Sequence, residues 1–397
     1  MWTQQYGRSG EDRDFRKHPS HHRSFAILRE AVIREKGGYV HPDLGLLQPA
    51  PSGAARGLGM VSDSYRQCQT RCFPGTWQEK QTNETAPPRS LAEDPIYKPE
   101  EVLIKIPLSF QMTRQVALDT LRPLIPAQVQ TAAGFHQLDD AALLVLLLAH
   151  ERGFGRLSRW LPYIATLPTQ PSCGYDRSIR PQILDMLEML RIEYNVETTA
   201  WSTELIKAAQ YATRIAESLN RDYGPYILHP RGVSPVENLE WALCHVASRA
   251  TAGHDRYGSL RLVPLMDMIN HDSTAGGFVE LTGQESWANK DFVEATPDDA
   301  GAFVVRSLRN GRRRPLKKGQ ELLVNYNVPH YTPLDWVIST GFLPPERWGP
   351  WQKADRVWPP QRWNAVPEGA KPTAEQWKED SPTIWRSIRE ADQKTSV

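Results

Sequence analysis

Residues 262–272 read LVPLMDMINHD, and this stretch carries most of the information about the fold. Its apolar first half predicts a β-strand that runs into the polar pair Asn270 and His271. An asparagine side chain has both a donor and an acceptor, which suits an amino-acid group or an adenine edge. The plain alternative is a turn in which Asn270 bonds its own backbone. A metal site of His271 with Asp267 and Asp272 is disfavoured, because it lacks the helical spacing of the usual zinc pairs.

Two more stretches hold candidate site residues. Residues 320–326 read QELLVNY and predict a strand that ends on Tyr326, although a lone tyrosine there is more often a core residue. Residues 56–59 read RGLG and predict a glycine-rich turn entering a strand, where the backbone could approach a ligand closely. A plain turn is the alternative. A phosphate-binding loop is disfavoured, because no strand before the turn and no long helix after it is apparent.

The middle of the chain has the periodicity of helices. It is predicted to be mostly helical over 111–232, with the clearest helices at 139–152, 181–195 and 201–222. The apolar run 141–149 is too short to cross a membrane and predicts a buried core helix.

Local signals mark the ends of two further helices. One is predicted over 25–36 and is stopped by Gly37 and Gly38. The other begins at Ser234-Pro235-Val236-Glu237, which combines a capping box with proline at the first helical position. Arg249 lies at the edge of the apolar stripe of that helix, where its guanidinium can reach a cleft while its stem packs. Short strands are predicted within 39–62, 102–107 and 260–326, so the chain is of the α+β class.

Composition excludes several classes of protein. The 397 residues are 40% hydrophobic with a formal net charge of +1, which argues against a disordered chain and against a basic nucleic-acid binder. Four cysteines in so long a chain are not expected to form a disulfide framework, and Cys68 with Cys72 lacks the second pair that a structural zinc needs. The first 40 residues lack the apolar segment of a secretory signal. We therefore expect an intracellular protein of the cytoplasm or nucleus, with the plastid as an alternative.

Five stretches taken together resemble one enzyme family. They are RGLG at 56–59, LSRWLPYIATLP at 157–168, Trp241-Ala242 with Ser248-Arg249, PLMDMINH at 264–271 and GQELLVNY at 319–326. In this order and spacing they are similar to the SET-domain methyltransferases. The branch that they resemble is typified by the Rubisco large-subunit lysine methyltransferase, which interrupts its SET domain with a long helical insertion.

The resemblance implies an architecture. The fold would be an α+β SET-domain fold of small twisted sheets around a cofactor cleft, interrupted by a mostly helical insertion lobe. The implied segments are a disordered lead-in at 1–24, an N-terminal SET part at 25–110 with an exposed insertion at 64–98, a helical insertion at 111–232, a C-terminal SET part at 233–346 and a Trp- and Pro-rich tail at 347–397.

The resemblance also implies a function. The chain would transfer methyl groups from S-adenosylmethionine to a lysine of a protein substrate, with Tyr326 as the catalytic residue and no metal. The implied cofactor-binding residues are Arg56, Gly57, Leu58, Gly59, Arg249, Asn270, His271 and Tyr326. We expect a monomer that binds neither nucleic acid nor membrane. The alternatives are a protein-histidine methyltransferase of the same family and a non-catalytic SET-like module that binds a protein partner.

Overall fold

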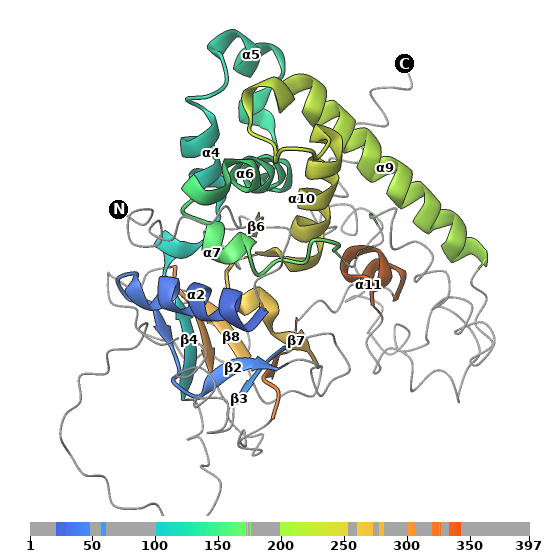
Figure 1. The fold of residues 1–397 in the computed structure, drawn as a ribbon. Helices are drawn as coiled ribbons and strands as arrows, with labels where there is room; N and C mark the ends of the chain where they lie inside the picture. Colours follow the sequence, from blue (N-terminus) through green and yellow to red (C-terminus); the bar gives the residue numbers. More distant parts are fainter. Residues whose placement is uncertain are drawn as a thin grey trace, which may run out of the picture. The chain divides into compact units, whose positions relative to one another are not determined.

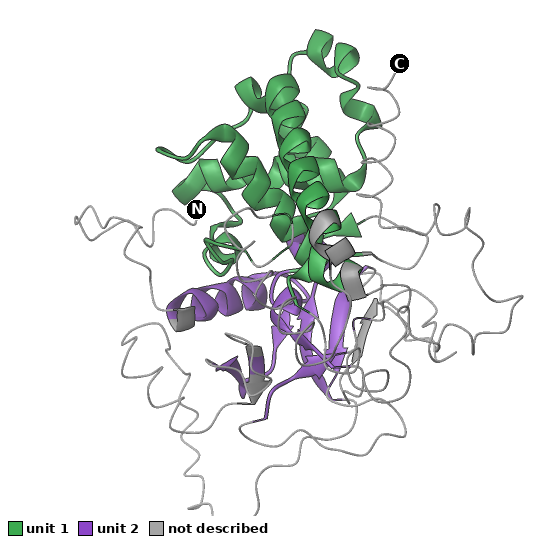
Figure 2. Cartoon of the chain, turned by 90° about the vertical axis from the view of Figure 1, so that its right-hand side faces the viewer, with its two compact units in different colours: residues 1–17, 111–263, 328–397 green, residues 18–110, 264–327 purple. Residues whose placement is uncertain are grey.

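The computed structural model forms two compact units, which Figure 2 shows in different colours. Unit 1 comprises residues 1–17, 111–263 and 328–397, and unit 2 comprises residues 18–110 and 264–327. Within them the structure describes residues 21–47, 57–60, 101–171, 173, 175, 199–252, 260–272, 278–281, 301–306, 320–324, 326 and 333–342. Arg56, the predicted helix 181–195, the insertion 64–98 and the tail 347–397 lie outside the described residues.

Unit 2 is built on a four-stranded antiparallel sheet (Figure 1). The strand order is β1-β4-β9-β8, and the bounds are Tyr39–Val40 for β1, Val102–Ile106 for β4, Phe303–Arg306 for β9 and Phe278–Leu281 for β8. The two central strands are mostly apolar and mostly buried, with Ile104, Ile106 and Val305 fully inaccessible to solvent. Strands far apart in the sequence therefore share one core, as expected for the α+β class.

Helix α2, His21–Arg34, packs against β1 and β2 and begins earlier than the sequence suggested. The prediction of a start at Phe25 was wrong, because the first turn carries polar residues that the apolar periodicity does not reveal. The predicted stop is confirmed. Gly37 has a φ of 81°, and a Cβ at Gly38 would collide with the carbonyl oxygen of Val32, so both positions need glycine to end the helix.

Two smaller sheets complete unit 2. Strand β2, Leu44–Leu47, pairs antiparallel with β3, Gly57–Met60. Strand β7, Asn270–His271, pairs parallel with β10, Leu323–Val324. The short 3₁₀ helices Leu108–Phe110 (η1) and Met266–Met268 (η5) lie in the same unit.

Unit 1 is mainly helical (Figure 1). Its helices are α4 Arg114–Leu121, α5 Ala127–Ala132, α6 Asp140–Phe154, α7 Leu161–Ile164, α9 Thr199–Tyr223, α10 Pro235–Arg249 and α11 Pro333–Thr340. Helix α6 packs against α4 and α10, and α10 packs against α9 and α11. The prediction of a buried helix over 141–149 is confirmed, because every residue from Leu143 to Ala149 is buried. A small hairpin of β5, Thr251–Ala252, and β6, Leu260–Arg261, joins this unit.

Side-chain caps explain where two of these helices begin. The carboxylate of Asp139 accepts the backbone N–H of Ala142 at 2.7 Å and starts α6. At α10, the Glu237 carboxylate accepts the backbone N–H of Ser234 at 3.2 Å, and Pro235 occupies the first helical position. The predicted start of α10 is therefore confirmed.

A disulfide that the sequence analysis did not predict joins Cys173 to Cys244 on α10. Cys173 lies beyond α7, and two hydrogen bonds fix its approach. The Trp241 indole Nε1 donates to the carbonyl oxygen of Pro168 at 2.9 Å, and the His245 Nε2 contacts the same oxygen at 2.9 Å. Both cysteines are fully buried. Spacing in the sequence could not reveal the pair, because helix packing brings the two residues together.

A buried polar network connects α6 to α10 and to the segment that follows α9. Asn238 is fully buried, and its Nδ2 donates to the carbonyl oxygen of Ala149 at 2.9 Å. Its Oδ1 accepts from Arg152 Nη1 at 3.1 Å, and His229 Nδ1 lies 3.2 Å from its Nδ2. Burial lowers the pKa of Arg152 to about 10. The network satisfies polar groups that would be costly to leave unpaired in the core.

Two histidines, His229 of this network and the nearby His150, predict how the stability of the protein depends on pH. His150 Nδ1 accepts the backbone N–H of Leu228 at 3.1 Å, and burial together with the nearby His229 lowers the pKa of His150 below 6.5. Burial also lowers the pKa of His229. Because the folded state favours the neutral rings, the stability that they contribute is fully present above pH 6.5. It is lost as the pH falls through 6.5 toward the lowered pKa values. Urea denaturation between about pH 7.5 and pH 5 should show a falling free energy of unfolding.

A matched variant separates His150 from the other titrating groups. Asparagine in His150→Asn offers an acceptor near the position of Nδ1 but does not titrate in this range. We expect a shallower fall in the free energy of unfolding than in the wild-type chain. Identical slopes in the two proteins would contradict the assignment.

Candidate functional site

The parallel strands β7 and β10 bring two of the sequence motifs together in unit 2. Asn270 is in register with Leu323, and His271 with Val324. The backbone N–H of Asp272 donates to the carbonyl oxygen of Val324 at 3.1 Å and extends the pairing. The prediction of a strand that runs into Asn270 was wrong in detail. The preceding residues form the 3₁₀ turn η5, and the Asn-His pair is itself the strand.

A turn at Leu265 causes this difference. Leu265 has a φ of 67° and a ψ of −45°, and it is the only described residue other than glycine with a positive φ. Such a conformation costs about 1–3 kcal/mol in a residue with a Cβ. Leu265 is fully buried, so its packing offsets the strain, and the turn redirects the chain just before Asn270.

Tyr326 is held against β7 by its side chain and by its backbone. The hydroxyl donates to the carbonyl oxygen of Ile269 at 2.8 Å, and the backbone N–H donates to His271 Nδ1 at 3.0 Å. The rings of His271 and Tyr326 lie 5.0 Å apart. Because His271 Nδ1 accepts a hydrogen bond, the proton of the neutral ring resides on Nε2. The His271 ring therefore positions Tyr326, a contact that the sequence analysis did not foresee.

Asn270 is oriented by a carboxylate. Its Nδ2 donates to Glu321 Oε1 at 2.6 Å, and the Glu321 side chain is buried. Glu321 comes just before β10, and the backbone N–H of the next residue, Leu322, donates to the carbonyl oxygen of Leu58 at 2.7 Å. This bond also connects β3 to the stretch that contains Tyr326.

The last three residues of the RGLG motif, 57–59, already lie in the strand β3, where the sequence suggested a turn entering a strand. In β3, Leu58 is fully buried and opposite Leu46, so Gly57 and Gly59 lie on the other face of the strand. Gly59 is opposite Gly45 of β2. The two facing glycines leave part of this face without side chains, beside Leu47, which is opposite Gly57. Gly45 was missed by the sequence analysis, because only pairing across the sheet reveals its position.

The structure brings together most of the predicted site residues. Gly57, Leu58 and Gly59 of β3 connect through Leu322 to the stretch that holds Glu321 and Tyr326, and β7 supplies Asn270 and His271. Arg249 is the last residue of α10 in unit 1, partly exposed, and its role stays a prediction. Glu321 was also missed by the sequence analysis. The signal that could have revealed it is its place in the QELLVNY stretch, three residues before the last residue of β10.

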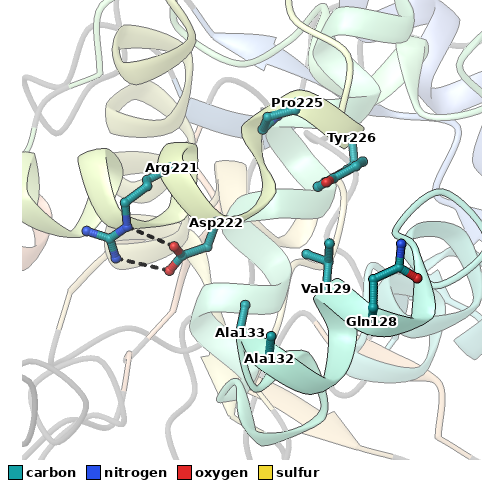
Figure 3. A pocket seen from close by; sticks show the side chains of 8 residues that line it. All are labelled: Gln128, Val129, Ala132, Ala133, Arg221, Asp222, Pro225 and Tyr226. Carbon is teal, nitrogen blue, oxygen red and sulfur yellow. Dashed lines mark hydrogen bonds and ion pairs between the residues drawn. The ribbon is translucent and has the colours of Figure 1, made fainter.

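A groove of about 760 Å³ lies elsewhere, in unit 1 (Figure 3). Its walls are α5, the end of α9 and the 3₁₀ turn η4, Gly224–Tyr226. Arg221 and Asp222 form an ion pair at one side, with 2.9 Å between Arg221 Nε and Asp222 Oδ1, and Tyr226 lies on the other side. The lining contains none of the residues that the sequence analysis singled out.

Metal clusters and membrane-spanning helices are both absent from the described part of the chain. No group of three or more His, Cys, Asp or Glu side chains among these residues could hold a metal ion. Within the same ranges, no helix has both the length and the apolar character needed to cross a bilayer.

Comparison with known proteins gives matches in structure alone. No protein-family model matches the chain, and no curated protein matches its sequence. The SET domain of LSMT bound to lysine and AdoHcy is similar with a TM-score of 0.51 and 14% identity, over 83% of this chain and 59% of that one. Rubisco LSMT bound to sinefungin and monomethyllysine is similar with a TM-score of 0.51 and 14% identity, over 82% and 57%.

A third solved structure, the SET domain of LSMT bound to methyllysine and AdoHcy, gives a TM-score of 0.50 at 14% identity over 80% and 57% of the two chains. The present chain thus spans less than two thirds of the length of each of these proteins. At such low identity the likeness concerns the fold. The chain has an α+β SET-domain fold with a large helical part, as the sequence predicted.

Proposed function

We propose that the chain is an S-adenosylmethionine-dependent methyltransferase that modifies a lysine side chain of a protein. The observation that carries this proposal is the cluster on β7 and β10, where Asn270, His271 and Tyr326 are linked by direct hydrogen bonds and strand pairing. The similar solved proteins are described as bound to lysine or methyllysine together with AdoHcy or sinefungin, which supports the same chemistry here.

The residues of unit 2 suit a ligand with an amino-acid group and a flat, neutral body. Asn270 offers a polar amide whose orientation is set by Glu321. The facing glycines Gly45 and Gly59 leave a stretch of backbone that a Cβ would otherwise cover. Asn270, His271 and the β3 backbone would hold the cofactor. When bound, S-adenosylmethionine supplies a methyl group on a sulfonium, so the reaction needs alignment and not a covalent enzyme intermediate.

Tyr326 is suited to orient the amine that accepts the methyl group. Its hydroxyl proton is directed to the carbonyl oxygen of Ile269, so the phenolic oxygen meets a substrate N–H as an acceptor. This contact would aim the lone pair of the amine away from Tyr326. A lysine amine must first lose its proton, and a channel of low dielectric would lower its pKa from the reference value of about 10.4.

Calorimetry with S-adenosylmethionine on chelator-treated protein tests the proposal. We expect binding without added metal. Asn270→Ala should weaken this binding by about 1–3 kcal/mol, because polar groups of the ligand are left unpaired. A thermal melt of the variant controls for folding. Lack of binding by the wild-type chain, or binding that requires zinc, would contradict the proposal.

The acceptor residue needs a separate experiment. The purified chain is incubated with methyl-labelled cofactor and a host-cell extract, and the modified residue is identified by mass spectrometry. Label on a lysine supports the proposal. Label on a histidine would instead show a protein-histidine methyltransferase. Cofactor binding with no labelled protein would favour a module that binds without catalysis.

A further inference from the structure

The contact between Glu321 and Asn270 has a consequence for which part of a ligand the site can bind. Its Oε1 lies 2.6 Å from Asn270 Nδ2, and its side chain is 7% exposed. A carboxylate buried to this degree is rare unless it is paired or hydrogen-bonded. The site therefore contains a fixed acceptor directly beside its ligand-binding asparagine.

The chemistry of the two groups permits only one orientation of the Asn270 amide. A carboxylate is an acceptor, so the NH₂ group of Asn270 must face Glu321, and the reverse orientation would place two oxygen atoms against each other. Asn270 therefore meets a ligand as an acceptor through Oδ1. An acceptor matches an ammonium group and not a carboxylate.

The two residues that follow Glu321 hold its backbone in this position. Leu322, the next residue, is fully buried and donates to Leu58 of β3 at 2.7 Å. The residue after it, Leu323, is in register with Asn270 itself. The backbone beside Glu321 is thus anchored to two sheets, and its carboxylate is buried against Asn270.

We propose that Glu321 is a positioning residue that orients the Asn270 amide and so makes the site selective for the ammonium of an amino-acid ligand. This inference rests on the proposed function. It assigns to Asn270 the ammonium of the cofactor, where the residue type alone suits carboxylate, ammonium or adenine equally.

Two ligands separate this role from a merely structural one. S-adenosylhomocysteine carries the ammonium, whereas 5′-methylthioadenosine has the same nucleoside and thioether without the amino-acid group. Their dissociation constants are measured by calorimetry on the full chain and on two variants. Glu321→Met removes every polar atom at similar length. Glu321→Gln keeps the shape but can either accept from or donate to Asn270, so both amide orientations become possible.

We expect Glu321→Met to weaken S-adenosylhomocysteine binding about tenfold or more, on the scale of a hydrogen bond to a charged group. Glu321→Gln should show an intermediate loss, and both variants should bind 5′-methylthioadenosine as the wild-type chain does. Glu151 provides a matched control in unit 1, because it is also a buried carboxylate, which accepts from Ser158 Oγ at 2.5 Å. Glu151→Gln should leave the ratio of the two affinities unchanged.

The outcomes distinguish failure of this inference from failure of the proposed function. A wild-type chain that does not bind S-adenosylhomocysteine overturns both. A wild-type chain that binds it, with variants that lose both ligands equally or lose neither, overturns the role of Glu321 alone. If Glu321→Met does not fold, the comparison of Glu321→Gln with the wild-type chain decides, since an unchanged affinity ratio there also overturns the role.

Discussion

Tyr326→Phe is expected to lower methyl transfer to the protein substrate by about 10²-fold or more while leaving affinity for S-adenosylmethionine nearly unchanged. The variant keeps the ring beside His271 and removes only the hydroxyl, which is held by the carbonyl oxygen of Ile269 at 2.8 Å. An interaction made mainly in the transition state contributes to turnover and not to ground-state binding. Removal of one precisely placed stabilising group typically costs this much in rate. Turnover is measured by transfer of labelled methyl groups, and affinity by calorimetry.

Tyr223 provides a matched control for this experiment. It is a buried tyrosine of unit 1 whose hydroxyl donates to the carbonyl oxygen of Ala133 at 2.6 Å. Tyr223→Phe thus removes the same kind of hydrogen bond at a position without a proposed role in the reaction, and turnover per folded molecule should persist. A Tyr326→Phe variant with wild-type turnover would remove Tyr326 from the catalytic residues. It would also take away the strongest support at the level of a single residue for an enzyme.

Removal of the Cys173–Cys244 disulfide should lower the free energy of unfolding by about 4 kcal/mol. The bond closes a loop with a sequence separation of 71, and the chain-entropy description of a cross-link gives about this value for such a loop. Either Cys173→Ser or Cys244→Ser removes the whole cross-link, so the double variant should be little less stable than the single ones. Urea denaturation with and without a dithiol reductant measures the effect.

The reductant serves as an internal control. It should destabilise the wild-type chain toward the level of the serine variants, and it should not affect the double variant. A wild-type chain whose unfolding is insensitive to reductant, while its free thiols are shown by labelling to include both cysteines, would contradict the disulfide.

Local signals in the sequence predicted much of the secondary structure. The capping box at Ser234 and the glycines after α2 act within a few residues, so their effect is the same whatever the rest of the chain does. Helix α11 was missed, because its β-branched residues and its short length resemble a strand or turn although Pro333 begins it. The prediction of a strand before Asn270 was wrong because a distant contact, and not a local signal, decides the structure there. The turn at Leu265 depends on burial in the folded unit.

The fold class, the start of α10, the end of α2 and the identity of most polar residues of the candidate site follow from the sequence alone. Which of those residues meet depends on how distant segments of the chain pack. The parallel pairing of β7 with β10, the orientation of Asn270 by Glu321 and the disulfide to Cys173 all join segments separated by about 50 to 70 residues in the sequence. Such contacts carry a cost in loop-closure entropy that is repaid only when the intervening chain has packed. Patterns of neighbouring residues in the sequence therefore do not reveal these contacts.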